Sequence, residues 1–216
     1  MSDRTTITIS RQLGCGGSYI GQLIATNLGI KYVDREVLHR AAQELGLEET
    51  VLAAHDQKLT PFWEKILRGL TFGPPEAPYT PPPVRTVSDK ELFKKETEIM
   101  KEIAANVDCV IIGRACGLVI PKHPGLLSIF FHAPIGFRVK RTMQVYNIQS
   151  KQQALSLIEE TDTMRTKYVA EMTGKEWGCA PNYNLCVDTS LMPFTEIAEM
   201  LVEIIKRRKE PTASQE

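Results

Sequence analysis

Residues 5–29 decide the fold, and they read TTITISRQLGCGGSYIGQLIATNLG. The stretch 5–10 is rich in β-branched side chains, which predicts a strand. A glycine cluster follows, after which isoleucine and leucine recur at helical spacing until Gly29, a residue typical of a helix end. The segment therefore predicts a strand, a tight turn and a helix in direct succession.

The glycine cluster Gly14-Cys15-Gly16-Gly17-Ser18 predicts a phosphate site. A glycine-rich turn that leads into a helix lets consecutive backbone amides converge on an anion, and the helix N-terminus adds a favourable partial charge. Glycine clusters also form plain structural turns, so the motif alone leaves that alternative open. Its position directly after the first strand favours phosphate binding.

The loop departs from a complete P-loop, which has the pattern Gly-x-x-x-x-Gly-Lys-Ser/Thr. If Ser18 is aligned with the hydroxyl that binds magnesium, Gly17 stands where the lysine belongs and Arg11 stands where the first glycine belongs. The lysine normally neutralises charge on the donor phosphates. A Rossmann dinucleotide site fits this sequence less well than a P-loop does, because Gly14-Cys15-Gly16 lacks the third glycine at the required spacing.

The rest of the chain alternates strand and helix patterns, which implies a parallel sheet with right-handed crossovers. Apolar runs predict strands at 30–33, 109–112, 127–131 and 185–187. Helices are expected at 37–41, 47–54, 62–70, 88–106 (with Ser88 and Glu91 as a capping box), 134–146, 151–172 and 193–208. Residues 73–83, GPPEAPYTPPP, predict a loop because proline interrupts both helix and strand.

Length and composition indicate one domain and exclude some functions. The chain has 216 residues, 43% of them hydrophobic, which suits a single buried core. Lysine and arginine total 26 and aspartate and glutamate also total 26, so no overall charge favours nucleic acid or an anionic membrane as a partner. Since the sequence shows neither a signal peptide nor an apolar run of membrane-spanning length, a cytoplasmic location is expected.

The cysteines and histidines show no metal-binding or disulfide pattern. Five cysteines are scattered without a Cys-x-x-Cys pair, so they are expected to be reduced thiols. Cys109 and Cys186 lie in apolar runs and are expected in the core. Cys15 lies in the glycine turn, where backbone amides would lower the pKa of its thiol, although a role as a small packing residue is the simpler interpretation. The four histidines, Trp177 and Tyr183 are expected to be structural.

Longer blocks of sequence resemble the cytidylate kinase-like family. The opening block is ITISRQLGCGGSYIGQLIATNLGIKYVDREVLHRAA, residues 7–42. It is followed by VIIGRACGLVIP at 110–121, LLSIFFHAPIGFRVKR at 126–141 and TGKEWGCAPNYNLCVDTS at 173–190, in the family's order. The resemblance covers roughly residues 6–208, although 48–88 matches no block.

The resemblance implies an α/β fold of the P-loop NTPase type. Three layers (α/β/α) are expected around a five-stranded parallel sheet, as one domain over 1–208 with a disordered tail at 209–216. A helical lobe that binds the acceptor nucleoside monophosphate is expected at about 37–106, and a helical lid at about 138–172. Active-site groups then gather at the carboxyl ends of the strands.

The resemblance also implies roles for individual residues, with ATP and Mg²⁺ as cofactors. Donor-phosphate contacts are expected from Gly14, Cys15, Gly16, Gly17, Ser18 and Tyr19, with Ser18 also on the metal. Acceptor contacts are expected from Asp34, Arg35, Arg40, Arg114, Asp162 and Arg165. For Asp34 and Arg35, a helix start with local ion pairs is an equal alternative. Catalytic charge is expected from Arg11, Arg114, Arg138, Arg141 and Arg165, because phosphoryl transfer depends on positioning and on neutralising the equatorial oxygens.

Two departures from the family pattern leave the function open. Cytidylate kinases have aspartate after Gly-Arg, whereas this chain has Ala115, and the P-loop lysine is missing, with Arg11 the first choice to replace its charge. The leading hypothesis is transfer of the γ-phosphate of ATP to a nucleoside monophosphate, CMP or a related pyrimidine nucleotide. The alternatives are a kinase of a small metabolite, since fold does not fix substrate, and a regulatory module that binds nucleotide without catalysis.

Overall fold

A computed structural model describes residues 4–34 and 87–209, and its centre is a five-stranded parallel sheet. The strands are β1 (Thr6–Arg11), β2 (Lys31–Val33), β3 (Cys109–Ile112), β4 (Leu126–His132) and β5 (Leu185–Asp188). Their order across the sheet is β2-β3-β1-β4-β5, with every neighbouring pair parallel. The predicted α/β class and parallel sheet are confirmed.

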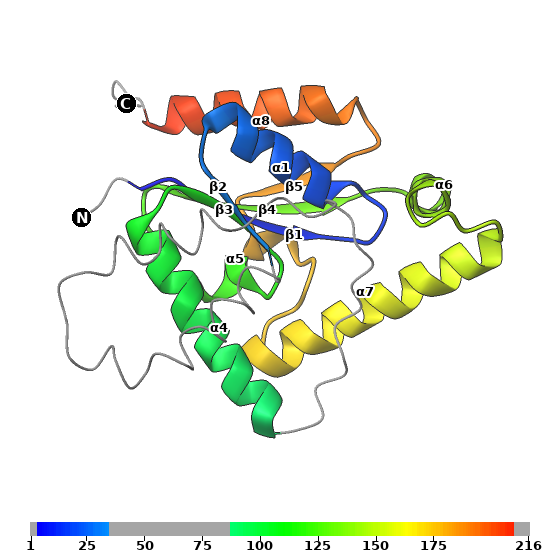
Figure 1. The fold of residues 1–216 in the computed structure, drawn as a ribbon, viewed down its shortest axis with the longest axis horizontal. Helices are drawn as coiled ribbons and strands as arrows, with labels where there is room; N and C mark the ends of the chain where they lie inside the picture. The colour runs from blue at the N-terminus through cyan, green and yellow to red at the C-terminus, as the bar shows by residue number, and fades with distance from the viewer. Residues whose placement is uncertain (1–3, 35–86, 210–216) are drawn as a thin grey trace.

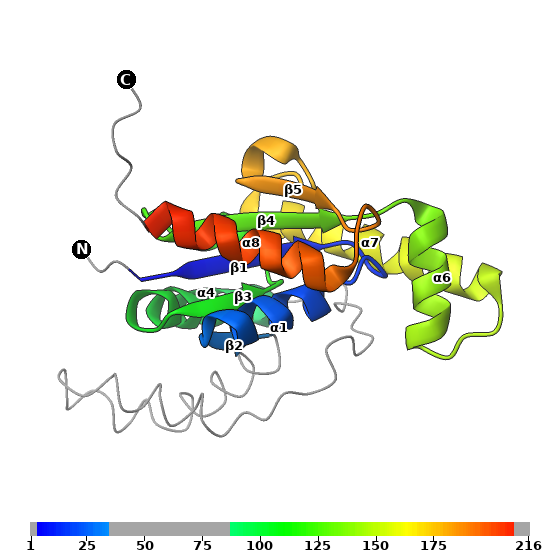
Figure 2. The ribbon, with the colours of Figure 1, turned by 90° about the horizontal axis from the view of Figure 1, so that it is seen from above.

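Helices cover both faces of the sheet (Figure 1). The bounds are α1 (Gly17–Leu28), α4 (Val87–Asn106), α5 (Cys116–Val119), α6 (Ile135–Val145), α7 (Lys151–Thr173) and α8 (Phe194–Lys209), with a 3-10 turn at Ala180–Asn182. Helices α1 and α8 lie on one face, and α4 and α5 lie on the other (Figures 1 and 2). The helices expected at 37–41, 47–54 and 62–70, and the loop at 73–83, lie outside the described residues.

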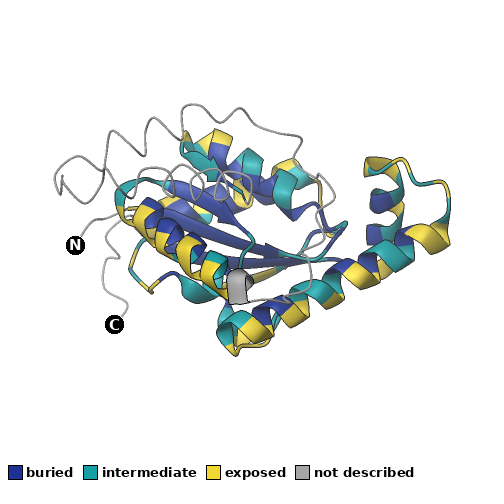
Figure 3. Cartoon of the chain, turned by 60° about the horizontal axis from the view of Figure 1, so that its bottom comes forward, coloured by how far each residue is buried: buried dark blue, intermediate teal, exposed yellow. Residues whose placement is uncertain are grey.

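The alternation of side chains along the strands divides the core in two. Ile7, Ile9 and Ile129 pack against α1 and α8, while Cys109 and Ile111 pack against α4 and α5. Both faces of the central strands are buried (Figure 3), as expected where helices cover both sides of a parallel sheet. No described helix combines the length and apolar character that crossing a membrane requires.

Helix α6 and the start of α7 extend beyond the carboxyl end of the sheet, and α7 then runs back on the side where α4 lies (Figure 1). The two helices cover most of the region predicted as the lid, residues 138–172. In contrast, α4, the described part of the predicted acceptor lobe, packs Ile99, Met100 and Ile103 into the core of the sheet domain. Helix α4 therefore contributes to the central layers. The exact boundaries of lobe and lid stay a prediction.

Candidate functional site

The glycine loop connects β1 to α1 at the carboxyl edge of the sheet. Gly14 and Gly16 have φ of +78° and +80°, in the left-handed region that favours glycine. A Cβ at Gly14 would lie 2.7 Å from the carbonyl oxygen of Arg138, and one at Gly16 would lie 2.5 Å from the Phe194 ring. Backbone shape and close packing thus both require these glycines. Helix α1 begins at Gly17, so its first amides face the loop.

Arg11 is the last residue of β1, and its side chain lies over the loop. Its Nε donates to Ser18 Oγ at 3.3 Å. The first carbons of its side chain pass Gly17, and a Cβ on Gly17 would lie 2.7 Å from Arg11 Cβ. Its Nη1 lies over Gly113, and a Cβ on Gly113 would lie 2.5 Å from that nitrogen. Arg11 therefore runs between two glycines, one from the loop and one from the turn after β3.

A buried ion pair ties helices α6 and α7 to the loop. Asp162 on α7 accepts the Leu13 amide on Oδ1 at 2.9 Å, and its Oδ2 pairs with Arg138 of α6 at 2.5 Å. Arg138 also donates to the Leu13 carbonyl at 3.3 Å. Leu13, Arg138 and Asp162 together form the Leu13 clasp.

Arg165, one turn beyond Asp162 on α7, is held against the end of β1. Its Nη1 donates to the Arg11 carbonyl at 2.8 Å and lies 3.6 Å from Asp162 Oδ1. Burial, together with the nearby charge of Arg11, lowers the pKa of the Arg165 guanidinium to about 10, against the opposing effect of Asp162. Arg165 therefore remains charged at neutral pH in a place where cations repel one another.

A first cavity opens above the glycine loop and is called the loop pocket. Its lining includes Gly14, Gly16, Gly17, Ser18 and the arginines Arg11, Arg141 and Arg165. The Arg141 guanidinium lies 4.5 Å from the centre of the Phe194 ring, a cation–π contact that orients the side chain at the rim. Glycine amides and three guanidinium groups give this pocket the chemistry to bind an anion of high charge.

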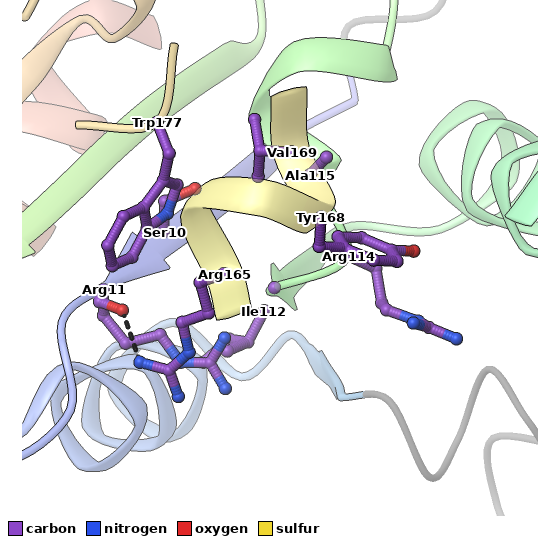
Figure 4. Close-up of a pocket in the computed structure, with 10 residues that line it drawn as sticks. Ser10, Arg11, Ile112, Arg114, Ala115, Arg165, Tyr168, Val169 and Trp177 are labelled. Atoms are coloured by element: carbon purple, nitrogen blue, oxygen red, sulfur yellow. Dashed lines mark hydrogen bonds between the residues drawn. The ribbon is translucent and has the colours of Figure 1, made fainter. Parts of the chain in front are cut away.

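A second cavity lies beside the first and is called the Arg114 pocket (Figure 4). It is lined by the ends of β1 and β3, the turn at 113–115 and side chains from α7, together with Trp177. Ser10 and the arginines give it polar groups, while Ala115, Tyr168 and Val169 make it partly apolar. Among the described residues, the two pockets share Arg11 and Arg165. These two cations thus stand between the cavities.

Arg114 is neutralised by a residue that the sequence did not point out. Its Nη2 pairs with Glu96 of α4 at 2.6 Å, with side-chain exposures of 8% and 0%, and its guanidinium lies over the Tyr168 ring. In Figure 4 the Arg114 guanidinium points away from Arg11 and Arg165. Glu96 lies on the same buried stripe of α4 as Ile99, Met100 and Ile103, and a charged residue within such a stripe is the signal that could have revealed it.

Other predicted residues lie at varying distances from the pockets. Arg138 is buried in the Leu13 clasp and, like Tyr19, lines neither pocket. Tyr19 packs edge-on against Phe194. Asp34 follows β2, and Arg35 and Arg40 lie outside the described residues. The roles assigned to these residues stay predictions.

The structure corrects one expectation about the cysteines and decides between the two interpretations of Cys15. Burial raises the pKa of the Cys15 thiol to about 11 and outweighs the hydrogen bond from the Gly17 amide, so the loop does not activate this thiol. Cys186, expected in the core, is exposed because β5 lies at the edge of the sheet. Cys109 is buried as expected, and the role of Cys15 as a small packing residue agrees with its complete burial.

The described residues offer little to a metal ion apart from the loop. Within residues 4–34 and 87–209, no group of histidine, cysteine, aspartate or glutamate is arranged to hold one. Ser18 Oγ lines the loop pocket and accepts from Arg11. A magnesium ion here would therefore depend on phosphate oxygens and water for most of its ligands, a common arrangement for this cation.

Parallel strands covered on both faces, with a glycine loop leading from β1 into α1, define a kinase-like P-loop protein. The sequence matches the profile of the cytidylate kinase-like family over residues 6–191, so the chain belongs to this family. A search of curated proteins found no match. The family supports phosphotransferase chemistry in general terms and leaves the acceptor undetermined.

Solved structures support the fold. An uncharacterized protein from Eubacterium ventriosum superposes with a TM-score of 0.66 at 20% identity, over 94% of this chain and 99% of that one. A gluconokinase from Sinorhizobium meliloti (16% identity, 97% and 96% covered) and a shikimate kinase from Acinetobacter baumannii (13%, 96% and 96%) give TM-scores of 0.49 and 0.47. The first likeness shows the fold alone, and nothing further follows from the other two.

Proposed function

We propose that this protein transfers the γ-phosphate of ATP, with magnesium, to a nucleoside monophosphate, preferably CMP or a related pyrimidine nucleotide. An ionised phosphate oxygen of the acceptor forms a bond to the γ-phosphorus. The bond from that phosphorus to the bridging oxygen breaks, and its electron pair leaves with ADP. The protein's task is to position both phosphates and to neutralise charge on the equatorial oxygens.

The observation that carries the proposal is the pair of adjacent pockets joined at Arg11 and Arg165. The loop pocket suits the donor phosphates, since glycine amides and the start of α1 converge there. The Arg114 pocket suits the acceptor, since it combines cations with the flat side chains of Tyr168 and Trp177. Two anions held on either side of a shared arginine pair are placed for transfer between them.

The loop pocket fits ATP and a magnesium ion that arrives with it. Gly14 and Gly16 give the loop its left-handed turns and let Arg138, Thr142 and Phe194 pack against it, which shapes the backbone around the pocket. Ser18 offers one hydroxyl ligand, and phosphate oxygens and water would complete the coordination. Magnesium would neutralise charge on the β- and γ-phosphates, and the residues of the chain would orient them.

A coupled assay that measures ADP release tests the proposal with ATP, magnesium and each nucleoside monophosphate in turn. We expect turnover with a pyrimidine monophosphate, and Arg165→Ala, which removes a cation that borders both pockets, should lower kcat/KM by about 10²-fold, the usual cost of losing one preorganised electrostatic group. Circular dichroism would check that the variant keeps its fold, because Arg165 also donates to the Arg11 carbonyl. Absence of turnover with every acceptor would refute the proposal.

A kinase of a small metabolite is the second candidate, and Ala115 favours it. This residue is 4% exposed and lines the Arg114 pocket where cytidylate kinases have aspartate, so one polar contact to a nucleotide acceptor is lacking. The same assay with sugar, acid and alcohol acceptors separates the two candidates. ATP binding without transfer to any acceptor would instead favour a regulatory nucleotide-binding module.

A further inference from the structure

We propose that Arg11 supplies from the end of β1 the positive charge that a P-loop lysine would supply from position 17, and that Gly17 is a glycine because Arg11 occupies its space. The inference rests on the proposed function, since it assigns this charge to the donor phosphates of ATP. It makes Arg11 a catalytic residue and Gly17 the residue that gives it room.

The first support is steric. A Cβ on Gly17 would lie 2.7 Å from Arg11 Cβ, 3.0 Å from Phe131 Cδ2 and 3.2 Å from Arg11 Cγ. Real Cβ atoms are essentially never found at the shortest of these distances, and Arg11 Cβ is fixed to the backbone of a central strand. Any side chain at position 17 therefore competes with Arg11. The sequence holds a cation at one of these two positions and a glycine at the other.

The second support is the path of the Arg11 side chain. Its Nε bonds to Ser18 Oγ, the hydroxyl that follows the lysine position in the motif. Its Nη1 extends over Gly113, whose missing side chain leaves 2.5 Å between that nitrogen and an ideal Cβ position. The guanidinium thus passes from the loop toward the turn after β3 and borders both pockets.

The third support is uncompensated charge. Within residues 4–34 and 87–209, no carboxylate lies within ion-pair distance of the Arg11 guanidinium, whereas Arg114 and Arg138 each have one. Arg165 is held nearby by its bond to the Arg11 carbonyl (Figure 4). Two guanidinium groups kept close together, with one lacking an anionic partner in the described protein, form a site for an external anion.

The position of the Arg11 guanidinium indicates which anion it binds. The Arg11 guanidinium lies beside Ser18 at the start of α1, where the amides of a P-loop meet donor phosphates. It also lies at the border with the Arg114 pocket, where the transferred group would pass. Charge that develops on the γ-phosphoryl oxygens and on the departing bridging oxygen would fall within its reach.

Reciprocal substitution tests the inference directly. Arg11→Gly combined with Gly17→Lys changes residues 11–18 to Gly-Gln-Leu-Gly-Cys-Gly-Lys-Ser, a complete P-loop motif. Isothermal titration calorimetry would measure MgATP binding to the wild type, Arg11→Gln, Arg11→Lys, Arg11→Gly, Gly17→Lys and the double variant. Lys140→Gln is the matched control, because Lys140 is an exposed cation on α6 that lines neither pocket.

We expect Arg11→Gln to raise the Kd for MgATP by about 10- to 100-fold, the usual effect of losing a charged hydrogen-bond donor. Arg11→Lys should raise the Kd for MgATP by a smaller factor, because lysine keeps the positive charge. Gly17→Lys alone should lower the melting temperature without tighter binding, since the new side chain meets Arg11 and Phe131. The double variant should bind MgATP with a Kd within about threefold of the wild-type value, because the lysine at position 17 restores one charged contact to the phosphates.

Several results would overturn the inference. Arg11→Gln with a Kd within twofold of the wild type would do so, as would a folded double variant that binds no better than Arg11→Gly. If the double variant does not fold, equal losses in Arg11→Gln and Arg11→Lys would assign Arg11 a packing role instead. MgATP binding that follows the expected series without transfer to any nucleotide would leave this inference standing and refute the proposed acceptor. Absence of MgATP binding to the wild type would refute both.

Discussion

Cys15 lies in the glycine loop, yet its surroundings are those of a core residue. Its thiol is fully buried and donates to the Phe131 carbonyl at 3.6 Å, while its own carbonyl accepts from Thr189 at 2.6 Å. Burial raises the pKa of this thiol from 9.0 to about 11. The loop is therefore anchored to the sheet by the side chain between its glycines.

This raised pKa predicts a loss of stability at high pH. Below pH 9 the thiol is protonated in both the folded and the unfolded chain, so it adds no pH dependence. Above that, the unfolded chain loses the proton first, so the free energy of unfolding falls as the pH rises toward 11, by about 2 kcal/mol in all from this group. Urea unfolding at pH 8 and at pH values above 10 measures the change.

The control for this prediction is the difference between two variants. Cys15→Ala should show a shallower decline than the wild type, because other groups that titrate in this range are common to both proteins. Cys186→Ala, at an exposed thiol, should change the slope less. Parallel pH profiles for the wild type and Cys15→Ala would show that the loop thiol titrates normally.

At the scale of elements, the Leu13 clasp couples α6 and α7 to the loop. Asp162 and Arg138 are 15% and 10% exposed at their side chains, so the pair is largely desolvated. The loop also packs closely against α6, because a Cβ on Gly14 would lie only 2.7 Å from the Arg138 carbonyl oxygen. The helices of the predicted lid are thus attached to the loop by Asp162 and Arg138, each of which bonds to Leu13.

We expect Asp162→Asn to destabilise the protein by about 3 kcal/mol, because it leaves the Arg138 charge buried without its partner. Urea unfolding measures this. Glu203→Gln is the matched control, since Glu203 pairs with Arg207 at side-chain exposures of 57% and 75% and its loss should leave stability nearly unchanged. Equal losses of unfolding free energy in the two variants would mean that the buried Asp162–Arg138 pair stabilises the fold no more than an exposed ion pair does.

At the scale of the whole molecule, the site exists only where separate elements meet. Arg11 comes from β1, Arg141 from α6 and Arg165 from α7, and they surround the start of α1. A ligand that bridges these elements should therefore stabilise the entire domain, because it binds only the folded chain.

MgATP at about 100 times its Kd should stabilise the fold by about 2.7 kcal/mol, which corresponds to a rise in melting temperature of roughly 5–10 °C for a domain of this size. A thermal scan with and without nucleotide measures the rise. Magnesium chloride alone should have no comparable effect. The absence of any rise with MgATP would argue against a nucleotide in the loop pocket.

Much of the fold could be predicted from the sequence, since its determinants are local. The pattern of residues 5–29 predicted β1, the glycine turn and α1, and the predicted helices 134–146, 151–172 and 193–208 match α6, α7 and α8 to within about one residue at each end. The short helix α5 was missed because four residues carry too little periodicity. Cys186 was wrongly assigned to the core, because an apolar run does not reveal that its strand is at the edge.

The sequence by itself determined the parallel α/β fold, the place of the glycine loop and the absence of its lysine, because strand runs, glycine spacing and helix periodicity are short-range properties. Only the tertiary structure decided which arginines border the loop and which are neutralised. Arg114 pairs with Glu96 and Arg138 with Asp162, partners 18 and 24 residues away, while Arg11 has no such carboxylate among the described residues. Charge compensation depends on distances between elements, and folding alone brings those elements together.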